Sequence, residues 1–304
     1  MSRAVFYALY ALLVAIWSST WVAIKIGLEE TPPLLGAGIR FAFAGVALLA
    51  VCALARRRLR VDAVLAAILA VGPFAIAYGL IYWGEQHIPS GLAAVLFGVM
   101  PIYVALIAAV TIAAEPLRAR VLAGVGVALA GLALAFNESL ALGDDAQAGV
   151  AAVACVLAPL ASAFGNVAIK KRGEGNDALA LNGWAMLAGG ALLLAASLPA
   201  EDWGAAVWTG QAFGAIGYLA IVGSAVPFVV LTLLIRELPV VTMSYLPLLL
   251  PFGALLMGAA FYDEPLTAAA LAGAALVGAG LVIAQGLLVT RSAASGSGAA
   301  ATRG

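Results

Sequence analysis

Long apolar segments separated by short polar connections constrain the fold more than any other feature of the sequence. A helix that crosses a bilayer needs about 20 predominantly apolar residues, and cutting the chain at its charged and proline-rich breaks leaves ten such stretches. With 65% hydrophobic and 10% charged residues, the chain has too few polar groups to cover a soluble domain, which carries about 25% charged residues. We therefore predict an all-α integral membrane protein with ten transmembrane helices. Their expected ranges are 4–27, 33–55, 62–83, 89–113, 119–136, 148–169, 178–198, 211–235, 239–262 and 268–289.

The loop charges predict the orientation of the chain. Loops rich in Lys and Arg stay on the cytoplasmic side of a membrane. With ten crossings, every Lys and Arg except Lys25 and Arg40 falls on the side of the N-terminus, whereas acidic residues such as Glu29 and Glu201 fall on the opposite side. We therefore expect a multi-pass membrane protein with both termini in the cytoplasm.

Short motifs of the first half return in the second half, in the same order and at nearly constant spacing. The matched pairs are Val22–Lys25 with Val167–Lys170, Pro89 with Pro239, Pro101 with Pro251, and Glu115–Leu117 with Glu264–Leu266. Each repeat then holds five helices, and because five is odd, the second repeat crosses the membrane in the opposite sense. Such inverted-topology repeats are typical of secondary transporters, which bind substrate near the midplane between the repeats. We expect one repeat at 1–144, the other at 145–290, and a disordered tail at 291–304.

Missing motifs exclude several classes of function. The formal net charge is zero, so no strongly basic face for nucleic acid is expected. His87 is the only histidine, and Cys52 and Cys155 lie inside apolar runs, so the sequence offers no catalytic triad, zinc motif or phosphate-binding loop. We expect no catalytic residue, metal or cofactor, and no enzymatic activity. No Asp or Glu lies at mid-span, which favours a uniporter or facilitative carrier over one coupled through a carboxylate relay.

Aromatic, hydroxyl and amide side chains recur at helical spacing on the predicted helices 1, 3, 4, 6, 8 and 9. Residues three or four apart share a helix face, and a polar group that faced lipid would lack a hydrogen-bond partner. We therefore expect these faces to line a substrate cavity. The substrate-binding candidates are Trp17, Ser18, Trp21, Tyr78, Tyr82, Phe97, Pro101, Ser162, Asn166, Ser244 and Pro247.

Three charged residues near the helix ends are candidates for a charge or gating role. They are Arg40, Glu85 and Lys25, and ionisable groups inside a membrane are often functional. The alternative is that Arg40 and Lys25 extend to the interface and pair there with Glu29, Glu30 or Glu85. Repetition of Lys25 as Lys170 favours the role of an interfacial anchor for Lys25.

Glycines predict where helices pack closely. Gly124 and Gly131 in the fifth predicted helix and Gly273 and Gly280 in the tenth recur at equal spacing. Since close backbone approach stabilises helix pairs in lipid, we expect a packing seam between these helices.

These features together resemble the EamA branch of the drug/metabolite transporter superfamily. The resemblance rests on the Trp-Ser stretch followed by Lys25, on Arg40-Phe41, on Pro101, and on Glu-Pro-Leu after the fourth and ninth helices. It implies a central cavity lined by helices 1, 3, 4, 6, 8 and 9, and export of small metabolites across the bacterial inner membrane. The aromatic, uncharged lining is more similar to YddG-type amino-acid exporters than to carriers of anionic sugar phosphates.

The resulting functional hypothesis is a monomeric secondary transporter that exports neutral or aromatic amino acids by alternating access. Its partners would be a small-molecule substrate and the lipid bilayer. A multidrug or nucleotide-sugar carrier of the same superfamily is the alternative, and a channel is the alternative from another class.

Overall fold

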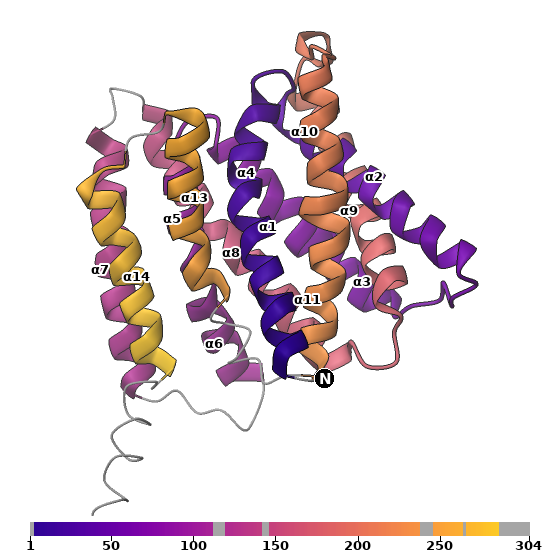
Figure 1. Cartoon of the computed structure of the whole chain (residues 1–304), viewed down its shortest axis with the longest axis horizontal. Coiled ribbons are helices and arrows are strands. Elements are labelled where there is room, and N and C mark those ends of the chain that lie inside the picture. Colours follow the sequence, from indigo (N-terminus) through magenta and orange to yellow (C-terminus); the bar gives the residue numbers. More distant parts are fainter. Residues whose placement is uncertain (1–2, 112–118, 142–145, 238–245, 264–265, 286–304) are drawn as a thin grey trace, which may run out of the picture.

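The computed structural model describes residues 3–111, 119–141, 146–237, 246–263 and 266–285, and within these ranges the regular structure is helical, without strands (Figure 1). Each of the ten predicted segments carries helix. The uninterrupted helices are α1 (Arg3–Leu28), α2 (Pro33–Leu54), α7 (Ala119–Ala141), α8 (Ala146–Arg172), α9 (Ala178–Ala200), α13 (Leu246–Tyr262) and α14 (Ala268–Gln285).

Three further rods are built from shorter elements. They are α3 (Ala63–Leu69) with η1 (Ala70–Ala77) and α4 (Tyr78–Gly84), α5 (Ser90–Phe97) with α6 (Met100–Thr111), and α10 (Gly210–Ala220) with η3 (Ile221–Ala225) and α11 (Val226–Glu237). A short 3-10 turn, η2 (Trp203–Ala205), precedes α10. Among the described residues, seven helices or rods are long and apolar enough to cross a membrane. The chain is therefore a multi-pass helical protein, and the crossing of all ten segments stays a prediction.

The breaks in two of the rods are π-helical and occupy matching places. Both η1 and η3 lie midway along the third and eighth predicted spans. Pro73 lies inside η1, where its missing N–H leaves the helix ladder one donor short. Because π-helical turns inside helices are rare and are frequent at functional sites, these two segments mark the region where a site is to be sought.

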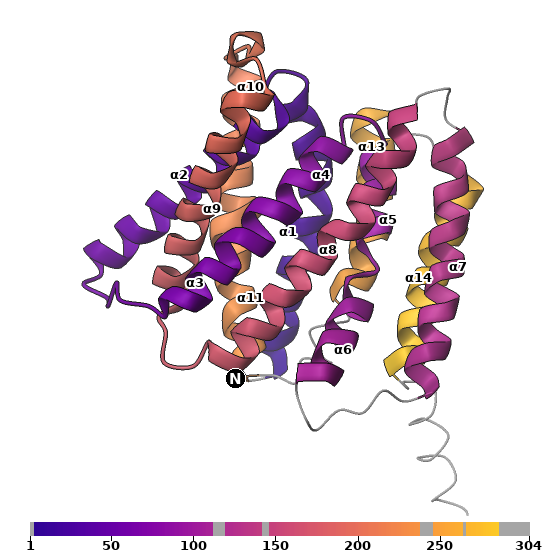
Figure 2. The same cartoon turned by 180° about the vertical axis from the view of Figure 1, so that it is seen from behind.

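Close-packed helix pairs form the two edges of the molecule, α7 with α14 at one edge and α2 with α9 at the other (Figures 1 and 2). A Cβ added to Gly131 would lie 2.7 Å from the carbonyl oxygen of Gly273, and one added to Gly280 would lie 2.6 Å from the amide nitrogen of Ala128. The predicted seam is therefore confirmed, and it runs antiparallel because Gly280 also faces Gly124.

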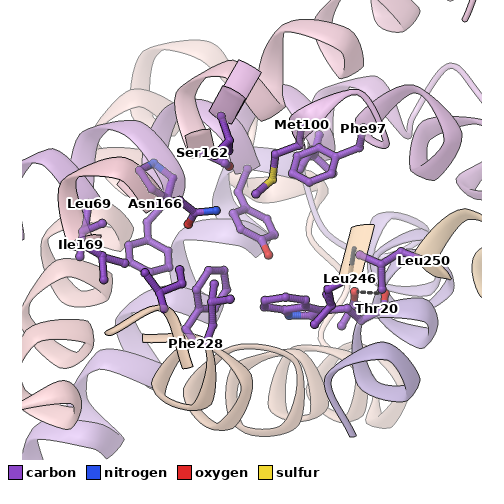
Figure 3. A pocket seen from close by; sticks show the side chains of 18 of the residues that line it. Thr20, Leu69, Phe97, Met100, Ser162, Asn166, Ile169, Phe228, Leu246 and Leu250 are labelled. Carbon is purple, nitrogen blue, oxygen red and sulfur yellow. Dashed lines mark hydrogen bonds between the residues drawn. The ribbon is translucent and has the colours of Figure 1, made fainter. Parts of the chain in front are cut away.

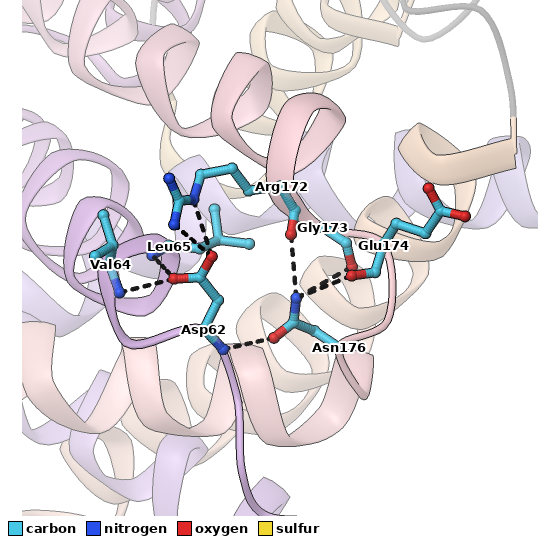
Figure 4. A network of polar contacts seen from close by, with 7 residues as sticks. All are labelled: Asp62, Val64, Leu65, Arg172, Gly173, Glu174 and Asn176. Atoms are coloured by element: carbon cyan, nitrogen blue, oxygen red, sulfur yellow. Dashed lines mark hydrogen bonds and ion pairs between the residues drawn. The ribbon is translucent and has the colours of Figure 1, made fainter.

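Ion pairs connect the loops at the end of the molecule where α1 begins (Figure 4). Asp62 caps α3 by accepting hydrogen bonds from the amides of Val64 and Leu65, and it also pairs with Arg172 at 2.8 Å. The Leu65 amide and the Arg172 guanidinium hold the pKa of the Asp62 carboxyl below its ordinary value. A parallel contact joins Arg57 to Asp177, the cap of α9, at 3.1 Å. These contacts tie the connection between α2 and α3 to the connection between α8 and α9.

Hydrogen bonds to carboxylates connect the loops at the opposite end. The Glu201 carboxylate accepts from the backbone amides of Leu34 and Leu35 at 2.7 and 2.9 Å, which satisfies the start of α2. The Glu30 carboxylate accepts from the hydroxyl of Thr209, the cap of α10. At both ends of the bundle, contacts thus connect the first half of the chain to the second half.

Candidate functional site

A cavity with a volume of about 100 Å³ lies in the middle of the bundle (Figure 3). A cavity that holds one water needs about 10–15 Å³ of such volume, so this cavity has room for several waters. Each of the predicted cavity helices 1, 3, 4, 6, 8 and 9 contributes to the lining. The seventh predicted helix, which is α9, also contributes, whereas α7 and α14 do not. The lining residues are Trp17, Thr20, Trp21, Ile24, Leu69, Pro73, Phe74, Tyr78, Ile81, Phe97, Met100, Pro101, Val104, Ser162, Asn166, Ile169, Asn182, Phe228, Leu231, Ile235, Leu246 and Leu250.

Aromatic rings form much of the wall and contact one another edge to face. Phe228 of α11 packs on Trp17 with ring centroids 5.4 Å apart and on Phe74 at 4.9 Å. Across the cavity Trp21 packs on Phe97 at 5.6 Å. Each such pair contributes about 0.5–1.5 kcal/mol beyond its buried area, so the rings form a connected and well-ordered surface. A flat apolar group of a ligand would find ring faces here.

Few polar groups reach the cavity, and they are neutral. The Asn166 amide and the Ser162 hydroxyl on α8 both point into the open space (Figure 3). Asn182 of α9 lies deeper, where its amide nitrogen donates to the hydroxyl of Thr232 at 2.8 Å. The indole nitrogen of Trp17 is buried without a hydrogen-bond partner among the described residues. The Asn166 amide offers a ligand both a donor and an acceptor.

The charged side chain of Arg40 lies directly behind the part of the cavity wall that Tyr78 forms. Its side chain is 0% exposed, and its guanidinium lies 4.7 Å from the ring centre of Tyr78, which lines the cavity. Its Nε donates to the Ser224 hydroxyl at 2.8 Å, Nη1 to the Tyr82 hydroxyl at 3.1 Å and Nη2 to the Gly223 carbonyl oxygen at 3.3 Å. Arg40 thereby joins α2 and α4 to the π-helical segment η3.

The alternative in which Arg40 extends to the interface is wrong, because three hydrogen bonds and the surrounding rings hold the guanidinium inside the bundle. Glu85 is also fully buried, at the end of α4, within electrostatic reach of Arg40. A cation near a buried carboxylate reduces the penalty that each charge incurs by leaving water. Both charged side chains thus lie inside the bundle rather than at its rim.

Lys25 and Lys170 make equivalent contacts at opposite ends of the bundle. Lys25 Nζ donates to the main-chain oxygen atoms of Glu85 and Ile88 at 2.7 and 3.2 Å. Lys170 Nζ donates to the main-chain oxygen of Ile235 at 3.2 Å. Both lysines therefore neutralise the carbonyl end of a helix, where the helix dipole favours a cation.

The structure brings together most of the residues that the sequence singled out. Trp17, Trp21, Tyr78, Phe97, Pro101, Ser162 and Asn166 all line the cavity. Two substrate-binding candidates lie elsewhere: Ser18 packs against Gly253, and Tyr82 accepts from Arg40. The charge or gating candidates Arg40, Glu85 and Lys25 also lie outside the lining. Ser244 lies outside the described residues, and Pro247 lies in α13.

Sequence reasoning missed Asn182 and Ser224. Asn182 is the only amide in the otherwise apolar run of α9, a signal that could have drawn helix 7 into the predicted lining. Ser224 lies within an ordinary apolar stretch of the eighth span, and only the bond from Arg40 reveals its role.

Comparison with known proteins places the chain in a family. The profile of the EamA-like transporter family matches residues 5–137 and again 149–285. The chain belongs to the EamA-like transporter family. It is therefore a membrane transporter, and its relatives agree with that assignment.

This chain aligns with two relatives over most of the length of each. The protein named uncharacterized inner membrane transporter YedA, of Escherichia coli (strain K12), is 31% identical over 86% of this chain and 84% of that protein. The uncharacterized transporter YoaV of Bacillus subtilis (strain 168) is 26% identical over 85% of this chain and 89% of that protein. A solved crystal structure with a TM-score of 0.70 and 20% identity covers 95% of this chain and 99% of its own. At that identity the structural likeness concerns the fold alone.

Proposed function

We propose that this EamA-family transporter exports small neutral or aromatic amino acids across the bacterial inner membrane by alternating access. The observation that carries the proposal is the cavity itself, whose lining residues are aromatic, aliphatic or neutral polar. An anionic sugar phosphate would enter this space without an opposite charge on the wall. An amino-acid side chain would stack on Trp17 and Phe228, and Asn166 and Ser162 would bind its polar groups.

The proposed topology is ten spans in a five-plus-five inverted repeat with both termini in the cytoplasm. Two successive matches to the same family profile and the equivalent contacts of Lys25 and Lys170 support it. In such transporters the substrate site lies at the interface of the repeats, and rigid-body movement of one repeat against the other exposes it to each side in turn. The π-helical segments η1 and η3 are the proposed hinges, one in each repeat.

Proteoliposomes of defined content test the substrate. Purified protein should release preloaded labelled phenylalanine or leucine with saturable kinetics, and should release glutamate and lysine far more slowly. Asn166→Leu should lower the apparent affinity by about tenfold, since a lost hydrogen bond costs about 1–1.5 kcal/mol. Ser162→Ala should have a smaller effect, and Ser19→Ala is its matched control because Ser19 lies on α1 outside the lining.

The other outcomes decide between the alternatives. Efflux of a cationic drug or a nucleotide sugar without amino-acid efflux would refute the proposed substrate and support a carrier of another branch. Ion conductance that never saturates would refute alternating access and support a channel. Unchanged kinetics in Asn166→Leu would show that the substrate does not bind in this cavity.

A further inference from the structure

A second hollow lies on the outer face of the bundle, between α9, the start of α2 and the rod of η1 and α4. It has a volume of about 1070 Å³, and we call it the lateral groove. The wall side chains Val71, Ile76 and Leu192 are 46–48% exposed, so the groove opens toward the surrounding medium. It shares no lining residue with the central cavity: Pro73 and Tyr78 face the cavity, whereas Ile76 and Gly79 face the groove.

Most of the lining of the lateral groove is apolar. The groove is about as long as one leaflet of a bilayer is thick. The apolar residues of the lining include Val71, Ile76, Leu80, Trp83, Leu192 and Ala196. From Val71 to Trp83 the groove runs about 18 Å at the helical rise of about 1.5 Å per residue. Half of the hydrocarbon core of a bilayer is about 15 Å thick. An occupant with its polar end at the interface would thus reach the bilayer centre.

Carboxylates gather at the loop end of the groove. Glu29, Glu30, Glu201 and Asp202 all belong to the lining there. The hydrogen-bond partners seen for three of them are neutral: the Thr209 hydroxyl for Glu30, two backbone amides for Glu201, and the Gly204 amide for Asp202.

No cationic side chain neutralises Glu30, Glu201 or Asp202 by a salt bridge within the part of the chain that the structure describes. The ion pairs seen in that part, Arg57 with Asp177 and Arg172 with Asp62, lie at the opposite end of the bundle. The head of the groove therefore carries a negative potential that attracts cations and repels anions. This charge, together with the apolar wall below it, defines the chemistry of the occupant.

We propose that the lateral groove binds a membrane phospholipid whose head group carries a primary ammonium. One acyl chain lies along η1, α4 and α9, and the ammonium donates charge-assisted hydrogen bonds to the carboxylates. A quaternary ammonium has the same charge but no N–H to donate, and an anionic head group is repelled. The expected order of binding is phosphatidylethanolamine, then phosphatidylcholine, then phosphatidylglycerol.

Lipid titration of the detergent-solubilised full chain tests the proposal. A lipid that binds the folded state raises the apparent Tm by mass action, and the three lipids are used with identical acyl chains. Half-saturation should need about fivefold less phosphatidylethanolamine than phosphatidylglycerol, the ratio expected for one favourable charge contact at a membrane surface. Equal half-saturation for both lipids would overturn the assignment of the carboxylates.

Matched variants locate the binding. Ala196→Trp places an indole in the path of the acyl chain and should abolish the lipid-dependent shift, whereas Leu198→Trp on the same helix should retain it, because Leu198 is 65% exposed and lies outside the lining. Asp202→Asn keeps the cap on Gly204 and should reduce the preference for phosphatidylethanolamine over phosphatidylglycerol. If Ala196→Trp keeps the full shift, or Asp202→Asn keeps the full preference, the lipid binds elsewhere. Because the groove and the cavity are separate, amino-acid efflux by the variants reports independently on the proposed function.

Discussion

Removal of the buried guanidinium in Arg40→Met should strongly destabilise the bundle. Arg40 is fully enclosed and donates three hydrogen bonds, to Ser224, Tyr82 and Gly223. Ser224 keeps a partner in the variant, because its hydroxyl also donates to the Leu219 carbonyl oxygen at 2.8 Å.

The magnitude follows from the groups that lose a donor. The Tyr82 hydroxyl and the Gly223 carbonyl stay buried, and each such group costs about 1–3 kcal/mol when left unsatisfied. Removal of the charge also relieves its own desolvation, which offsets part of the cost of about 2–6 kcal/mol for the two groups. We therefore expect a loss of about 4 kcal/mol in the free energy of unfolding.

Thermal unfolding in detergent is the assay. At roughly 2 °C per kcal/mol for a chain of this size, the apparent Tm should fall by about 8 °C. Arg58→Met is the matched control, because Arg58 is exposed and surface substitutions stay within about 0.5 kcal/mol. Arg40→Lys keeps the charge but cannot reach three partners from one ammonium, so it should rescue only part of the loss. A Tm of Arg40→Met within about 2 °C of the parent would refute the reasoning.

Two further predictions concern the helix seam and the loop contacts. Gly280→Ala should destabilise by about 1–3 kcal/mol, because its Cβ would meet the Ala128 backbone, whereas Gly126→Ala, with nothing within 4 Å, should stabilise by about 0.4–1 kcal/mol. Chemical unfolding of both variants measures the difference, and equal effects would contradict close packing at Gly280. Because the pKa of Asp62 is lowered in the folded chain, its ionised form stabilises above the ordinary carboxyl pKa, and this contribution is lost as pH falls through the lowered value. The apparent Tm of the parent should therefore fall more steeply between about pH 5 and pH 3 than that of Asp62→Asn, and identical slopes would show that the charge of Asp62, with its Leu65 and Arg172 contacts, adds no stability.

Helix positions and close-packed seams were readable from the chain, because both depend on local composition. A run of about 20 apolar residues must be helical in lipid whatever surrounds it, and the structure places helices at 33–54 and 178–200, within two residues of expectation. Gly131 and Gly280 permit close backbone approach wherever their helices meet. The same locality explains the cavity face of α8, since Ser162 and Asn166 share it by spacing alone.

The sequence by itself determined a multi-pass helical protein, the family motifs and seven of the residues that line the cavity. Only the tertiary structure decided where the charged side chains lie. Whether Arg40 reaches the interface or stays inside depends on which rings and hydroxyls the crossing helices bring to it, and Ser224 is far away in sequence. The Trp17–Lys25 stretch shows both cases: helical spacing puts Trp17 and Trp21 on one face, but the fold alone supplies Phe228 for Trp17 and a carbonyl for Lys25. Hydrophobic length is a property of a segment, whereas the stability of a buried charge is a property of its neighbours.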